Sequence, residues 1–343
     1  MGHERSRDMN LPVGNGFNLT RRSWLESVFA VAGIGSFATI PGVRAFAREA
    51  QQDNRERRVP NASLSRQFAR WVSGLRYEDL PPAVVDRAKG LTLHALASSL
   101  LGFQSPAGQQ AVKFIMEEEA GIRNGATILV TGAKATKGGA AFANSEMMLA
   151  GGKWDTFRML THPGTSIIPA ALVAAETEGA SGRDFITGLA AGYEVMERMA
   201  ADFIPTVMAR GFHAGPVFGI FGAAVAAAKI LRFNEDQITS AIGLSVNLAG
   251  GNLESGGLRE GAAVRNAMLA VSLAKQGSRS GETAPEGNAG FYHAYAGNNK
   301  GQLTYSFTGD TQTSLDKIIA NLGREWMFLE TSLAKRSLLW VSG

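Results

Sequence analysis

Residues 211–229 read Gly-Phe-His-Ala-Gly-Pro-Val-Phe-Gly-Ile-Phe-Gly-Ala-Ala-Val-Ala-Ala-Ala-Lys, an apolar run without a charged side chain before its last residue. Pro216 suits the first turn of a helix, where its missing N–H would have no partner in any case. The chain contains 41 glycines, and many of them stand inside apolar runs such as 188–192 and 219–228. This pattern predicts helices that pack closely through small side chains.

Helical spacing of apolar residues continues through most of the chain on both sides of this run. We expect helices over residues 64–75, 82–102, 107–119, 140–148, 166–178, 183–202, 216–231, 236–249 and 262–275. Asn234 and Gln237 have the spacing of a helix capping box. The sequence therefore predicts a mainly α protein whose large helical domain spans residues 61–300.

Strand-like patterns are few. Residues 125–132 form a short β-like run between glycines, and 302–307 alternate as a strand does, followed by an expected helix at 313–322 and a strand at 326–329. We interpret residues 301–343 as the beginning of an α+β domain that is truncated.

The first 47 residues have the order of an export signal. Arg21-Arg22 is followed by the weakly apolar stretch 28–40 and by Ala45-Phe46-Ala47, a small-x-small cleavage pattern. The apolar stretch is shorter than the ~20 residues that a membrane-spanning helix needs. We predict a twin-arginine signal at 1–47, export by the twin-arginine translocon to the periplasm, and a solvated linker at 48–60.

Composition excludes several classes of function. The net charge is +4, and five arginines against three acids in residues 1–47 supply half of it. The remaining body is nearly balanced, which argues against a nucleic-acid partner. Cysteine is absent, so disulfides, thiolate metal sites, iron–sulfur clusters and a cysteine nucleophile are excluded.

Several motifs in order resemble the 2-methylcitrate dehydratase family (MmgE/PrpD). They are Leu80-Pro81-Pro82, Ala140-Ala141-Phe142-Ala143-Asn144, Asp155-Thr156, Thr161-His162-Pro163-Gly164, and the run that begins at Gly211. The resemblance implies a helical domain with a smaller α+β lid, usually in a homodimer. It also implies lyase or isomerase chemistry on a small polycarboxylate without cofactor or metal, at a site between the two domains.

Two histidines stand just before expected helices: His162 precedes Pro163-Gly164-Thr165, and His213 precedes Ala214-Gly215-Pro216. Helix N-termini attract anions, and imidazole suits proton transfer near neutral pH. We predict catalytic roles for His162 and His213, and carboxylate binding by Gly164 and Thr165. His94 and His293 are interpreted as structural.

The family motifs point to further candidate site residues, and at several motif positions this sequence differs from the family. Asp155 and Thr156 match part of the family's acidic motif, which implies that they orient His162 or hold the substrate hydroxyl; helix capping is the alternative. The motif's histidine and first two acids are replaced by Leu149, Gly152 and Trp154. Arg259 is the nearest substitute for the expected basic residue before Gly261, and it is the candidate for a carboxylate clamp.

The leading hypothesis is a hydro-lyase of the 2-methylcitrate dehydratase type, which dehydrates or decarboxylates a small polycarboxylic acid by acid/base catalysis. The missing acids and the altered end of the chain favour an alternative, an inactive helical remnant that binds polyanions or dimerises. An isomerase or epimerase of a dicarboxylate is a third possibility, since all of these reactions begin at a carbon next to a carboxylate.

Overall fold

The computed structural model describes residues 62–257 and 259–333 of the chain. The predicted signal at 1–47 and linker at 48–60 lie outside these residues, as does the segment 334–343. In the part that is described, no helix has both the length and the apolar character needed to cross a membrane.

The described residues are mainly helical, which confirms the predicted fold class. The longer helices are α3 (Leu64–Gly74), α4 (Pro82–Phe103), α5 (Pro106–Glu118), α6 (Lys137–Ala150), α7 (Pro163–Glu178), α8 (Gly182–Ala200), α10 (Ala214–Ile230), α11 (Glu235–Leu248) and α12 (Arg259–Lys275). Short helical turns are η2 (Tyr77–Asp79), α9 (Ile204–Ala209), α13 (Phe291–Ala296), η3 (Leu315–Ile318) and η4 (Met327–Glu330). Two antiparallel pairs of two-residue strands complete the fold: β1 (Ala126–Thr127) with β2 (Lys134–Ala135), and β3 (Asp155–Thr156) with β4 (Ser332–Leu333).

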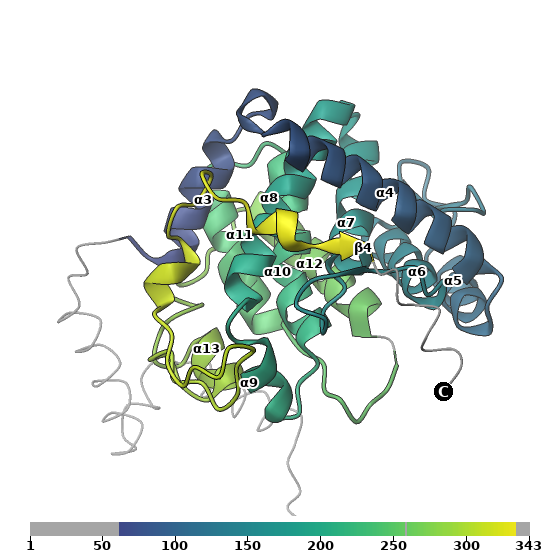
Figure 1. The fold of residues 1–343 in the computed structure, drawn as a ribbon. Coiled ribbons are helices and arrows are strands. Elements are labelled where there is room, and N and C mark those ends of the chain that lie inside the picture. Colours follow the sequence, from purple (N-terminus) through teal and green to yellow (C-terminus); the bar gives the residue numbers. More distant parts are fainter. Residues whose placement is uncertain (1–61, 258, 334–343) are drawn as a thin grey trace, which may run out of the picture. The chain divides into compact units, whose positions relative to one another are not determined.

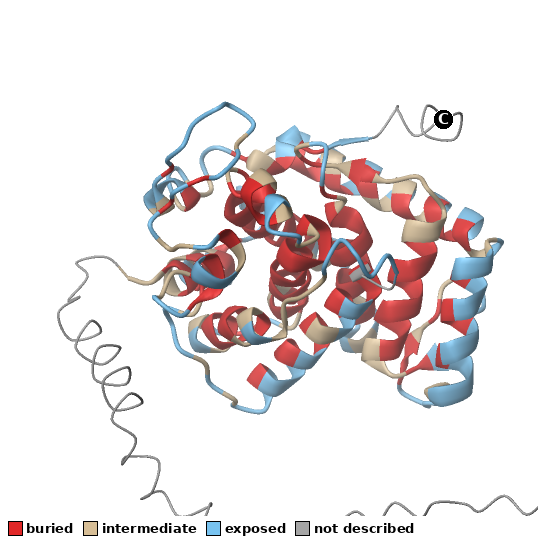
Figure 2. Cartoon of the chain, turned by 90° about the horizontal axis from the view of Figure 1, so that it is seen from below, coloured by how far each residue is buried: buried red, intermediate tan, exposed pale blue. Residues whose placement is uncertain are grey.

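Helix α10 is the centre of the core. Every one of its residues except Lys229 is buried, and it packs against α7, α8, α11 and α12 (Figure 1). Buried residues accordingly concentrate on the inner helices, while outer helices keep an exposed face (Figure 2). A Cβ atom on Gly192 would lie 2.5 Å from the carbonyl oxygen of Gly222, so α8 and α10 touch through their backbones. The predicted packing through small side chains is confirmed.

This close approach predicts an effect of Gly222→Ala on stability. The added Cβ would lie 2.6 Å from Ile167 Cδ1 and 2.9 Å from the carbonyl oxygen of Gly192. We expect the variant to lose about 1–3 kcal/mol in the free energy of unfolding because the core is overpacked. Gly90→Ala in α4 is the matched control: its Cβ meets no atom within 4 Å, and it should gain roughly 0.5–1 kcal/mol. Urea unfolding measures both, and equal effects would contradict the close packing.

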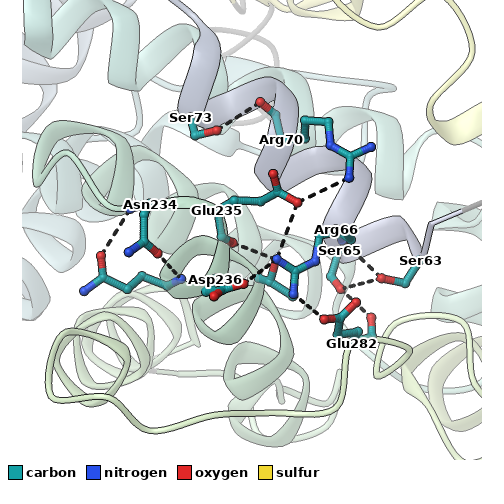
Figure 3. Close-up of polar contacts among 11 residues, drawn as sticks. Ser63, Ser65, Arg66, Arg70, Ser73, Asn234, Glu235, Asp236 and Glu282 are labelled. Atoms are coloured by element: carbon teal, nitrogen blue, oxygen red, sulfur yellow. Dashed lines mark hydrogen bonds and ion pairs between the residues drawn. The ribbon is translucent and has the colours of Figure 1, made fainter.

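Helix α3, the first helix of the described residues, is held to α11 by a polar network. Arg66 bonds Asp236 Oδ1 at 2.6 Å and also contacts Glu235 and Glu282 (Figure 3). Beside it the Asn234 side chain accepts from the Gln237 N–H, and the Gln237 side chain accepts from the Asn234 N–H. The predicted capping box is therefore confirmed.

Residues 301–333 differ from the expectation. Residues 302–307 do not form a strand, the expected helix at 313–322 is only the turn η3, and the expected strand at 326–329 is η4. Of the alternating apolar residues, Leu303 is buried, while Tyr305 and Phe307 are exposed. Backbone groups here bond the helical body, since Thr206 Oγ1 accepts the N–H groups of Thr304 and Tyr305. Local backbone pairing is limited to a bridge between Gln302 and Gln312, and the domain boundary at residue 300 stays a prediction.

Arg198 of α8 anchors this segment from inside the body. Its guanidinium donates to the carbonyl oxygens of Ile318 (3.2 Å), Ala320 (2.7 Å) and Glu325 (2.7 Å). It also pairs with the buried Glu194, whose second carboxylate oxygen accepts the N–H of Phe328 at 3.0 Å. This buried pair holds the chain on its way to β4, which in turn pairs with β3 at the entrance to α7.

Candidate active site at the head of helix α7

The chain enters α7 through β3 and a tight loop. Phe157 and Thr161 pair with each other across the loop, and the two residues after Phe157 have positive φ angles of 50° and 62°. The loop brings His162 to the N-cap of α7 and turns the chain back toward Asp155. A histidine and a carboxylate from neighbouring segments therefore meet at the start of one helix.

The Asp155 carboxylate binds the N-terminus of helix α7. Its two carboxylate oxygens lie 3.0 and 2.9 Å from the N–H of Gly164, and Oδ2 accepts the Tyr193 hydroxyl at 2.7 Å. Burial raises the pKa of the Asp155 carboxyl from 3.8 to about 6, although the donors from Tyr193 and Gly164 favour the charged form. A Cβ on Gly164 would lie 2.8 Å from Asp155 Oδ2, so glycine permits this approach. Asp155 can exchange a proton near neutral pH.

The His162 ring is oriented by its neighbours. Nδ1 lies 2.8 Å from the backbone carbonyl oxygen of Asp155, which can only accept, so Nδ1 carries the proton. The ring stacks on Trp154 with 4.5 Å between centroids, and the His162 carbonyl accepts the Thr165 hydroxyl at 2.7 Å. With the proton on Nδ1, Nε2 is the nitrogen of the neutral ring that carries a lone pair.

A small hollow adjoins these groups. The residues that line it include Asp155, Gly164 and Thr165 together with His94 of α4, Lys153 and Trp154. Its volume of about 10 Å³ has room for roughly one water molecule. The hollow therefore brings three predicted site residues together with one imidazole and one ammonium that were not expected there.

His94, which we interpreted as structural, lies at this hollow, and its role stays a prediction. Burial lowers the pKa of its imidazole, and the positive charge of Lys153 lowers it further. The ring is therefore neutral at physiological pH and able to accept a proton. A signal for Lys153 was present in the sequence, because it stands directly before Trp154-Asp155 in the altered acidic motif.

His213 lies at the head of α10, as predicted, in a second polar group. It is the N-cap of that helix, with its backbone N–H bonded to the Gly251 carbonyl at 3.1 Å. Its Nδ1 lies 3.8 Å from Oε1 of the buried Glu260 of α12, and its side chain is 15% exposed. A Cβ on Gly215 would lie 2.8 Å from that Glu260 oxygen. Sequence reasoning missed Glu260, which faces His213 from 47 residues further along the chain.

Helix α6 connects the polar group around Asp155 and His162 with the polar group around His213 and Glu260. Ser145 donates to the carbonyl oxygen of Thr165 at 2.6 Å, and the adjacent Glu146 accepts the N–H of Gly261 at 2.9 Å. The heads of α7 and α12 are thus tied to consecutive residues of one helix. Neither His162 nor His213 is among the residues that line the α7 hollow, so this hollow does not bring the two predicted catalytic imidazoles together.

The other predicted site residues have different positions. Thr156 is half-buried, and its backbone pairs with Ser332 in β4. The Gly164 N–H is engaged by Asp155, and the Thr165 hydroxyl is engaged by His162. Arg259 begins α12, but its side chain lies outside the described part of the chain.

The described residues contain no group of three or more histidines, aspartates or glutamates that could hold a metal ion. The expectation of a reaction without metal or cofactor stays a prediction.

Comparison with known proteins agrees with the helical architecture. Residues 66–304 match the model of the MmgE/PrpD N-terminal domain. The cis-aconitate decarboxylase-like protein oryM of Aspergillus oryzae is 27% identical over 287 residues, covering 78% of this chain and 57% of that protein. The cis-aconitate decarboxylase of Aspergillus terreus is 25% identical over 280 residues, covering 77% and 55%. The human cis-aconitate decarboxylase is 25% identical over 284 residues, covering 77% and 58%. The chain thus spans a little over half the length of these curated relatives.

Proposed function

The chain belongs to the MmgE/PrpD family, and from this premise we propose that it is a lyase acting on a small polycarboxylate, by decarboxylation or dehydration. The observation that carries the proposal is the buried Asp155 carboxyl at the head of α7, with a pKa of about 6. It lies within reach of the loop that carries His162 and lines a hollow with Lys153. Relatives named cis-aconitate decarboxylases make cis-aconitate the first substrate to test.

The chemistry requires one proton transfer at a carbon next to a carboxylate. In decarboxylation the carbon–carboxylate bond breaks, CO₂ leaves, and the electron pair moves into the carbon frame, where a proton is added. In dehydration a base removes the proton at that carbon, and an acid protonates the departing hydroxyl. Asp155 in its protonated form supplies the acid, and His162 accepts or returns a proton through Nε2.

Positive charge at the hollow favours the carboxylates of the substrate. The Lys153 ammonium attracts them, and Arg259 remains our proposed clamp for a second carboxylate. A tricarboxylate is larger than the hollow of about 10 Å³. Substrate entry therefore requires the side chains around the hollow to move, including that of Trp154, which lines it and stacks on His162.

Product formation tests the proposal. Purified chain is incubated separately with cis-aconitate, 2-methylcitrate and citrate, and proton NMR follows the alkene and methylene signals. We expect one of the three to be converted at a rate proportional to protein concentration. Folded protein that leaves all three unchanged, under conditions in which a full-length decarboxylase relative turns over, would contradict a catalytic role.

A polyanion-binding protein without turnover is the second candidate, favoured by the small hollow and by the use of the Gly164 N–H within the protein. Calorimetric titration with cis-aconitate separates the two candidates. Binding without product supports the binding protein, whereas product formation excludes it. A dicarboxylate isomerase stays a third proposal, recognised by conversion without loss of CO₂ or water.

We also propose that the protein is exported through the twin-arginine pathway, on the basis of Arg21-Arg22 and Ala45-Phe46-Ala47. The double variant Arg21→Lys/Arg22→Lys should accumulate in the cytoplasm of a bacterial host, because the pathway reads the arginine pair itself. Immunoblots of periplasmic and cytoplasmic fractions measure this. Lys300→Arg in the body is the control, and equal export of wild type and double variant would contradict the signal.

A homodimer is proposed on family membership. Sedimentation velocity of the purified chain should show twice the monomer mass of 36.3 kDa, and a monomer at micromolar concentration would contradict it.

A further inference from the structure

A second cavity lies beside the loop that leads into α7. Its volume is about 150 Å³, enough for several water molecules. Residues of that loop, of the segment after α8 and of residues 303–317 line it, among them Arg158, Asp202, Ser306, Asp310 and Lys317. None of its lining residues belongs to the hollow at Asp155. It is therefore a separate site, and nothing about it rests on the proposed function.

Arg158, which lines this cavity, has an N–H group without an acceptor among the described residues. Its Nη2 pairs with Glu330 at 2.8 Å, and its guanidinium lies over the Phe157 ring at 5.4 Å. Its Nε atom is buried and has no hydrogen-bond partner within residues 62–257 and 259–333. The backbone at Arg158 is left-handed, with φ of 50°, a conformation that non-glycine residues adopt at some cost. A buried N–H without a partner is uncommon and calls for a ligand or ordered water.

Ser306 is the second such group. Its Oγ is buried and likewise lacks a partner among the described residues, and it lines the same cavity. Neighbouring polar side chains are already satisfied: Thr313 donates to Asp202 at 2.5 Å, and Thr308 donates to Asp310 at 2.7 Å. One cavity is thus lined by two residues that carry an N–H and an O–H without an acceptor among the described residues, and the oxygen atoms of an anion would supply that acceptor.

We propose that this cavity binds a small carboxylate that carries one adjacent hydrogen-bond donor, of the size of a hydroxy acid or an amino acid. The carboxylate accepts from Arg158 Nε and Ser306 Oγ, where a charge-assisted bond is strongest. The ligand's own hydroxyl or ammonium donates to Asp202 or Asp310. Two cationic and two anionic side chains line the cavity, so a tricarboxylate would meet uncompensated repulsion, whereas a hydroxy acid or zwitterion would not.

Titration of the whole chain with L-lactate and with glycine, followed by ligand-observed NMR and calorimetry, tests the proposal and tells a hydroxy acid from an amino acid. At least one should bind, acetate should bind more weakly, and citrate should not compete. Arg158→Lys keeps a charge for Glu330 but removes Nε–H, and Ser306→Ala removes the hydroxyl. Each should weaken binding about tenfold, the effect of losing one bond to a charged group.

Arg183→Lys is the matched control, because Arg183 pairs with Glu78 and lies over the Tyr77 ring in the same manner, at 3.2 and 5.0 Å. It should bind as the wild type does. Ser306→Ala without ligand should melt at or above the wild-type temperature, since its hydroxyl has no protein partner to lose. Absence of binding by the wild type, undiminished binding by both cavity variants, or a lower melting temperature of Ser306→Ala would overturn the site.

Discussion

Arg198→Met is expected to destabilise the chain by about 3–5 kcal/mol, the cost of breaking a buried ion pair by removing one partner. Both side chains of the pair are almost fully buried, at 4% exposure for Arg198 and 0% for Glu194. Burial already raises the pKa of Glu194, so the lone carboxyl would take up a proton instead of remaining charged. The carbonyl oxygens of Ile318, Ala320 and Glu325 would lose their donors as well.

Urea unfolding and hydrogen exchange measure this effect. Exchange should accelerate first in residues 318–333, because Arg198 holds that segment to α8. Arg183→Met, which removes an exposed arginine paired with Glu78, should change stability by less than ~1 kcal/mol. The double variant Glu194→Met/Arg198→Met should recover part of the loss, since it leaves no buried charge. An Arg198→Met protein as stable as the Arg183→Met control would show that the anchor is not needed.

His162→Ala is expected to lower kcat on the polycarboxylate substrate by ~10²–10⁴-fold, the usual contribution of a general acid or base. The variant loses the ring's bond to the Asp155 carbonyl and its stacking on Trp154 but no capping bond to α7, so the helix itself should be retained. The measurement is the initial rate of product formation, with unfolding by urea in parallel.

His293→Ala is the control for this variant, since His293 is exposed on α13, in a segment distant in sequence. It should retain wild-type turnover. Loss of activity in His162→Ala together with a large loss of stability would assign a structural role to the ring, and full activity would remove His162 from the mechanism.

Much of the helical body could be predicted from the sequence because local patterns determine it. Apolar periodicity gave the helices, and the short polar-to-proline sequences at His162 and His213 placed both histidines at helix N-caps, where the structure has them. The small residues of 219–228 predicted the contact that Gly192 and Gly222 make. The helices and the two N-caps depend on residues within about one helical turn, whereas the contact between Gly192 and Gly222 joins two helices.

The rest of the site depends on contacts between distant segments. Asp155 reaches the α7 head only because Arg158 and Met159 adopt left-handed backbone angles, which non-glycine residues rarely do. His94 reaches the same hollow through the packing of α4 against β3. In residues 302–307 the alternating pattern was misleading, because backbone pairing stops at a single bridge between Gln302 and Gln312 and the Thr206 hydroxyl binds the next backbone N–H groups.

The pH dependence of kcat/KM, for the wild type and for Asp155→Asn, tests the central claim most directly. Asp155 acts as an acid only while protonated, so wild-type kcat/KM should be highest below its pKa of about 6 and fall tenfold per pH unit above it. Asparagine keeps an oxygen for the Tyr193 hydroxyl and the Gly164 N–H but carries no exchangeable acid proton. Because the folded-state pKa is raised, ionisation of Asp155 reduces stability as pH rises from about 4 to above 6, and Asp155→Asn should therefore be at least as stable as wild type at pH 8.

We predict that Asp155→Asn loses ~10²–10⁴-fold in kcat/KM at pH 5.5 and that its remaining activity no longer declines around pH 6. A variant that keeps wild-type turnover with the same decline near pH 6 would contradict the assignment of proton transfer to the head of α7.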